Sequence, residues 1–194
     1  MLGGTAGEGL GWLDGLVRVR GSALFGYAYV LTGDRNAADD LVQGALVRTF
    51  RKGRGDMPLN AAHACVKRSM LTSFIDGGRR PRARPAIVHD AGVADGAWPA
   101  SPNPTAATDE RMNLYRAITS LPPLQRACLV MRYVDGFNAA SIARELNLAP
   151  GTMRKYFSEA VAALRTRAPE LARSLTHSGA ASAVRVRAVQ LARG

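Results

Sequence analysis

The chain has 194 residues, with 26 lysines and arginines against 15 acidic residues and a formal net charge of +11 at pH 7. This excess favours a polyanion partner, nucleic acid first, with a merely solvated basic surface as the alternative. Cys65, Cys128 and the three histidines lack metal-ligand or nucleophile spacing, so we expect buried thiols, no metal, no cofactor and no enzyme activity. With no apolar run that could span a bilayer and no signal-like N-terminus, the sequence predicts a cytosolic protein without membrane contact.

The first half of the chain is predicted to be helical. Residues 12–76 show apolar positions at three-to-four spacing, interrupted at Thr32-Gly33-Asp34, which indicates a helix end and a new start. A second helix is expected over about 36–50 and a third over 61–75. Gly77-Gly78 is expected to end this block.

A Pro-rich segment follows the first helical block. Residues 78–108 hold five prolines among Gly, Ala and Ser, which is typical of a flexible linker. The linker starts with the basic cluster 79–84, which can lie on a phosphate backbone or serve solubility alone.

Helical periodicity returns at Asp109, and Pro122-Pro123 is suited to open a further helix that ends near Asp135-Gly136. The last helix is expected to end at about Arg167. Beyond it, residues 169–194 form a basic tail that is either weakly amphipathic or disordered.

Residues 136–157 have the pattern of a helix-turn-helix. Asn147 is a residue type that tolerates the left-handed conformation of a turn between two short helices, and Pro150 suits the first turn of the second helix. The Arg154-Lys155 pair follows in that second helix, where it can reach phosphates or base edges of DNA. The apolar positions that would join the two helices are Ile142, Ala143, Leu146, Leu148, Met153, Tyr156 and Phe157. An ordinary helical hairpin is the alternative interpretation.

These patterns together predict an all-α fold with two small helical domains joined by a Pro/Gly-rich linker. The expected boundaries are 10–77 for the first domain, 78–108 for the linker, 109–168 for the second domain and 169–194 for the tail.

The chain resembles the extracytoplasmic-function (ECF) group of bacterial sigma factors of the sigma-70 type. Ala38-Asp39-Asp40-Leu41-Val42-Gln43 follows a Thr-Gly-Asp turn and is similar to the family's Ala-Glu-Asp-Leu-Val-Gln motif. Segments 121–126 and 131–136 match the family up to the helix-turn-helix. The resemblance implies a sigma domain 2-like and a sigma domain 4-like unit, and a factor that binds core RNA polymerase and recognises the minus-10 and minus-35 promoter elements.

The family's functional residues carry over to three places. Polymerase binding is implied for Asp39, Asp40 and Gln43, which otherwise form a solvated acidic helix start. Minus-35 reading is implied for Thr152, Arg154, Lys155 and Ser158. Minus-10 binding is implied for Lys67, Arg68, Thr72, Ser73, Arg79 and Arg80. Gly77-Gly78 stands where many relatives carry aromatic residues, and Glu159 where a basic residue is common.

Two other functions remain open from the sequence. One is a stand-alone helix-turn-helix transcriptional regulator that binds an operator as a dimer. The other is an interaction protein whose basic surface docks an acidic partner such as an anti-sigma factor, which is also a possible partner of a sigma factor.

Overall fold

The structure is a computed structural model that describes residues 6–51, 57–79, 115–167 and 169. All regular secondary structure within these ranges is helical, which confirms the all-α class. Most of the expected linker and nearly all of the basic tail lie outside the described residues, so their boundaries stay predictions.

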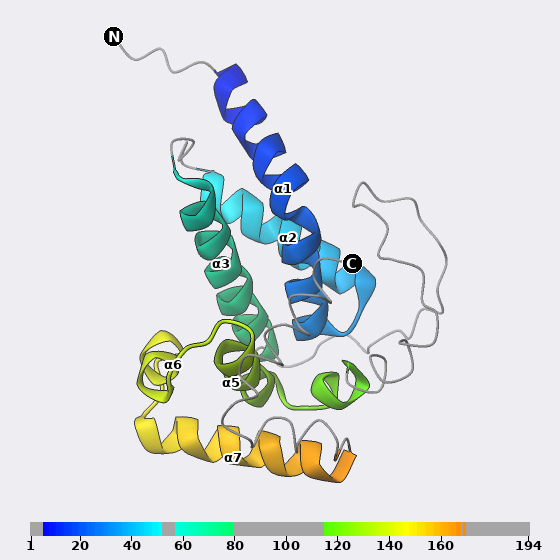
Figure 1. Cartoon of the computed structure of the whole chain (residues 1–194), viewed down its shortest axis with the longest axis vertical. Coiled ribbons are helices and arrows are strands. Elements are labelled where there is room, and N and C mark those ends of the chain that lie inside the picture. Colours follow the sequence, from blue (N-terminus) through cyan, green and yellow to red (C-terminus); the bar gives the residue numbers. More distant parts are fainter. Residues whose placement is uncertain (1–5, 52–56, 80–114, 168, 170–194) are drawn as a thin grey trace.

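Helices α1 (Ala6–Thr32), α2 (Arg35–Phe50) and α3 (Leu59–Arg79) pack together, and we call them the N-terminal unit (Figure 1). The predicted break between α1 and α2 is confirmed. Gly33 has a φ of 75°, a left-handed conformation that suits glycine, and its N–H donates to the Tyr29 carbonyl at 2.8 Å. Asp34 then caps α2, because its carboxylate accepts from the Ala37 N–H at 2.8 Å.

Helix α3 is longer than the sequence predicts. We expected it to end before Gly77-Gly78, but it runs through both glycines to Arg79. Glycine costs about 1 kcal/mol relative to alanine inside a helix, so local propensity alone favours an earlier end. The reason for the correction is tertiary, since Gly78 lies against Pro123 at the start of α5.

The C-terminal unit comprises a helical turn at 115–119 and the helices α5 (Pro123–Tyr133), α6 (Ala139–Glu145) and α7 (Pro150–Arg167). Pro123 opens α5 and Pro150 opens α7, as expected for residues without an N–H to satisfy. Asn138 caps α6 by accepting from the Ser141 N–H at 2.8 Å.

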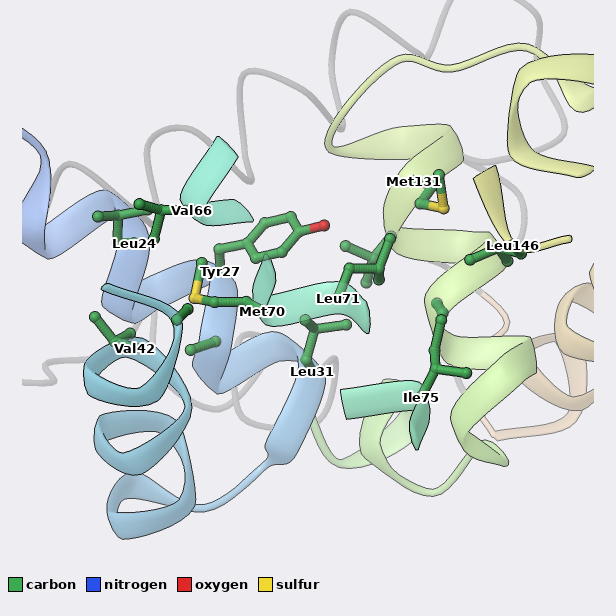
Figure 2. Packing of buried hydrophobic residues seen from close by; sticks show 14 of the residues in the cluster. Leu24, Tyr27, Leu31, Val42, Val66, Met70, Leu71, Ile75, Met131 and Leu146 are labelled. Carbon is green, nitrogen blue, oxygen red and sulfur yellow. The ribbon is translucent and has the colours of Figure 1, made fainter. Parts of the chain in front are cut away.

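The two units share one apolar cluster. We expected two separately folded modules, but α1, α3 and α5 pack against one another, and Leu71 and Ile75 of α3 face Met131 and Leu146 of the C-terminal unit (Figure 2). A second cluster lies mainly within the C-terminal unit, around Leu121, Leu129, Tyr133, Ala160 and Leu164. The units are therefore docked, and helical periodicity in the sequence gave no sign of it.

A candidate nucleic-acid interface

The second helix of the helix-turn-helix is anchored on one side and open on the other. Met153 is buried, as are Ala160, Val161 and Leu164 further along α7. Arg154, Lys155 and Ser158 are exposed and Thr152 is half-buried. The four residues predicted to read the minus-35 element thus lie on one helix, three of them with their side chains in solvent.

The turn before α7 has the geometry that the sequence predicted. Asn147 has a φ of 50°, and the Leu148 N–H donates to the Ala143 carbonyl at 2.8 Å. Ile142, Ala143 and Leu146 are buried, so the small side chain of Ala143 lies at a helix contact. This arrangement holds α7 across α6 with a fixed orientation.

Glu159 has a structural role that explains the presence of an acid on α7. Gln125 of α5 donates to its Oε2 at 2.8 Å, and Lys155 lies 3.9 Å from its Oε1. The carboxylate ties α7 to α5, and it lowers the positive charge available to phosphate beside Lys155.

The α3 cations meet acids of the C-terminal unit. Lys67 forms an ion pair with Asp135 and lies 4.4 Å from the centroid of the Tyr27 ring. The Tyr27 hydroxyl donates to the other oxygen of Asp135 at 3.0 Å, and burial, helped by this carboxylate, raises the pKa of Tyr27 well above its usual value. Arg68 pairs with Glu145 of α6 at 2.5 Å. The two acids belong to the C-terminal unit, and they were not among the predicted site residues.

The remaining minus-10 candidates are less informative. Thr72 is exposed and Ser73 half-buried, and both hydroxyls donate to carbonyls of their own helix, at 3.0 and 2.7 Å. The side chain of Arg79 and all of Arg80 lie outside the described residues.

The acidic face of α2 is open to a partner. Asp40 and Gln43 are exposed and Asp39 is half-buried, with Gln43 donating to Asp39 at 2.9 Å. Val47, one turn beyond Gln43, is 63% exposed and adds an apolar side chain to the same face. Val47 was not among the predicted binding residues, although its spacing of seven from Asp40 places it on the same side of α2.

The described ranges hold no group of three His, Cys, Asp or Glu residues that could bind a metal ion. Burial raises the pKa of Cys128 to about 11, which makes it an inert thiol, while Cys65 is only half-buried. Within the part of the chain that the structure describes, no helix is both long and apolar enough to cross a membrane.

The fold and the open face of α7 define a helix-turn-helix DNA-binding protein. Comparison with known proteins is more specific. Residues 111–164 match the family model described as sigma-70, region 4. The ECF RNA polymerase sigma factor SigL of Mycobacterium tuberculosis is 31% identical over 154 residues, which cover 77% of this chain and 85% of that protein.

Two further similar proteins are a curated relative and a solved structure. The RNA polymerase sigma-E factor of Streptomyces avermitilis is 29% identical over 152 residues, covering 77% of this chain and 80% of that protein. A solved structure of the sigma factor RpoE in complex with the anti-sigma factor NepR, from Bartonella quintana, is 21% identical with a TM-score of 0.48 and covers 79% of this chain and 94% of that one. The chain belongs to the ECF sigma factors, and it directs RNA polymerase to promoters.

Proposed function

We propose that three surfaces divide the work of this sigma factor. Helix α7 reads the minus-35 element, the cations of α3 bind the minus-10 region, and the acidic face of α2 binds core RNA polymerase. The observation that carries the proposal is the polarity of α7, whose buried face fixes it to the protein while Arg154, Lys155 and Ser158 remain exposed.

The α2 face fits a protein partner better than DNA. Asp40 is acidic and exposed, so it repels phosphate, and Val47 offers an apolar anchor beside it. A polymerase surface with complementary charge would bury Val47 and pair with the acid. We infer that Asp39, which Gln43 contacts, helps to orient the Gln43 side chain.

The α3 cations fit the strand opened at minus-10. Lys67 and Arg68 follow each other on α3, and the exposed Thr72 lies one turn beyond Arg68. Arg68 and Thr72 share one side of the helix, where a cation and a hydroxyl can hold single-strand phosphates. No bond is made or broken by the protein, so its contribution is binding energy alone.

The two DNA surfaces gain affinity from being linked. A chain with two weak readers binds its second element at a high effective concentration once the first is bound. We expect the protein to act in the cytoplasm, where polymerase and chromosome are found, and an acidic protein that competes with DNA for Arg154 and Lys155 to be a further partner.

The proposal is tested with purified protein, core bacterial RNA polymerase and promoter templates selected from a random library by the reconstituted holoenzyme. Run-off transcription that depends on the added chain supports it. The Asp40→Ala, Gln43→Ala double variant should weaken binding to core enzyme without loss of helicity, while Asp14→Ala, at an exposed acid of α1, should not. No binding to core enzyme and no transcript at low salt would refute it. A sequence-specific footprint without polymerase would instead favour a stand-alone regulator.

A further inference from the structure

Helix α7 carries an acid beside the residues that we propose to read DNA. Glu159 directly follows Ser158 and lies one turn beyond Lys155, and its side chain is 42% exposed. Phosphate repels a carboxylate, so a favourable contact of Glu159 with duplex DNA requires a hydrogen-bond donor. The donors that bases present in the major groove are the exocyclic amines of cytosine and adenine.

The spacing along α7 brings Glu159 within reach of base edges. Thr152, Lys155 and Glu159 succeed one another at intervals of three and four residues, so they share one side of the helix. At about 1.5 Å of rise per residue, this row is about 10 Å long, which corresponds to about three base-pair steps. A helix that places Thr152 and Lys155 in the major groove therefore places Glu159 over the neighbouring base pairs.

Gln125 of α5 holds the Glu159 carboxylate in place. Its side-chain nitrogen donates to Oε2 of Glu159 at 2.8 Å, and both side chains are half-buried. Helices α5 and α7 pack against each other through a common apolar cluster that includes Leu129 and Leu164 (Figure 1). A side chain held from a neighbouring helix loses less rotamer freedom on binding, so it is prepared to contact a base at one position.

The other oxygen of Glu159 can accept a further hydrogen bond. Lys155 Nζ lies 3.9 Å from Oε1, which is within the range of an ion pair but beyond that of a hydrogen bond. Lys155 is 72% exposed and precedes the acid, which is the less favourable order for a pair four residues apart on a helix. The ion pair therefore contributes little to stability, and it leaves Oε1 able to accept from a base.

A donor and an acceptor side by side match the major-groove edge of a G·C pair. That edge presents the O6 and N7 acceptors of guanine beside the N4 amine of cytosine. Lys155 can donate to the guanine while Oε1 of Glu159 accepts from the cytosine. Guanine or thymine in place of this cytosine would set a carbonyl oxygen against the carboxylate, and two acceptors that face each other cost binding energy.

We propose that Glu159 is a specificity-determining residue, which selects cytosine at one position of the minus-35 element by accepting from its N4 amine. Gln125 is the positioning residue that holds the carboxylate towards that base. The inference rests on the proposed function, because it requires α7 to lie in the major groove. It adds to that function the identity of one base and a reason why guanine and thymine are rejected there.

Exchange of residue 159 tests the proposal. Holoenzyme is reconstituted with the parent chain or a variant, and promoters are selected from a library randomised over the minus-35 element. The parent should select cytosine at one position by at least about fivefold over guanine or thymine. At that position alone, Glu159→Gln should change the preference to adenine and Glu159→Arg to guanine. Glutamine bonds N6 and N7 of adenine, and arginine bonds O6 and N7 of guanine.

Two further variants separate base reading from charge and from fold. Glu145→Gln removes the same charge from α6 and should leave the selected minus-35 sequence unchanged. Gln125→Leu releases the Glu159 carboxylate from α5 and should lower the cytosine preference about threefold, while preferences at the other positions stay as they are. A hydrogen bond that only stabilised α7 would instead weaken binding at all positions alike. Circular dichroism checks that each variant keeps its helicity.

The outcomes distinguish this inference from the proposed function. If Glu159→Gln and Glu159→Arg select the same sequence as the parent, or if the parent prefers another base where these variants differ from it, Glu159 does not select cytosine. The assignment of α7 as the minus-35 reader would stand in that case, provided that Arg154→Ala still alters the selected sequence. If the parent holoenzyme selects no minus-35 sequence, the proposed function fails and this inference fails with it.

Discussion

Helices α3 and α7 carry similar cations but present them differently. On α7, Arg154 and Lys155 are exposed, and the nearest acid to Lys155 belongs to the same helix. On α3, Lys67 and Arg68 pair with acids of the opposite unit, and the Lys67 side chain is only 20% exposed. Equal charge in the sequence therefore does not mean equal availability to DNA, because a cation paired within the protein offers little to a phosphate.

The comparison suggests an order of events. The exposed cations of α7 can meet duplex DNA directly, whereas Lys67 of α3 becomes available only when Asp135 moves away. The α2 face with Asp40, the proposed polymerase site, is exposed and needs no such movement. Variants at the contact and on α7 test this contrast.

The largest expected effect comes from Arg126→Met. The change removes a buried donor from the carbonyls of Leu31, Thr119 and Leu121 and should lower the free energy of unfolding by about 3–4 kcal/mol. Urea denaturation measures it. Arg132→Met, at an exposed position of the same helix, is the control and should change little. Equal losses in the two variants would contradict a special role for Arg126.

Asp135→Asn should destabilise the protein by about 2 kcal/mol, since Lys67 loses its charged partner in a largely buried place. The same variant should bind oligo-dT more tightly than the parent, because Lys67 is released. Fluorescence anisotropy at fixed salt measures the binding. Glu145→Gln should cost less than about 0.5 kcal/mol, because Arg68 is 71% exposed. Unchanged oligo-dT affinity in Asp135→Asn would argue that Lys67 takes no part in DNA binding.

Arg154→Ala removes one of the exposed cations of α7. If the guanidinium reads a base, the change should cost about 1–3 kcal/mol at one minus-35 position and relax its specificity. If the guanidinium contacts phosphate only, binding to all templates should weaken by the same factor. Binding of holoenzyme to a set of single-base variants of the selected promoter distinguishes the two. The free energy of unfolding should not change, because this side chain is exposed.

The effect that is smallest at neutral pH concerns His63 of α3. Burial, with Lys67 and Arg20 nearby, lowers its pKa from 6.5 to about 4, so the folded protein keeps it neutral where the unfolded chain binds a proton. The stability that depends on neutral His63 is complete above pH 6.5 and is lost as the pH falls towards 4. Melting temperatures between these values should fall less steeply in His63→Gln. Parallel slopes for the two proteins would show that other groups govern the acid response.

Much of the local structure was readable from the residues. Asp34 as a cap, Pro123 and Pro150 as helix starts and Asn147 in a left-handed turn were each predictable, because a few neighbouring atoms decide their conformations. The open face of α7 also followed from spacing, since helical geometry sets which side chains share a side. The predicted end of α3 was wrong, because Gly78 packs against Pro123, which is distant in the sequence.

The sequence by itself determined the helices, the helix-turn-helix and the family to which the chain belongs, since these depend on short-range spacing and on motifs. Only the tertiary structure decided that Lys67 meets Asp135, that Arg126 bonds to α1 and that the two units share an apolar cluster. Contacts between residues far apart in the chain depend on how whole helices pack, and no periodicity within a single helix encodes its partner.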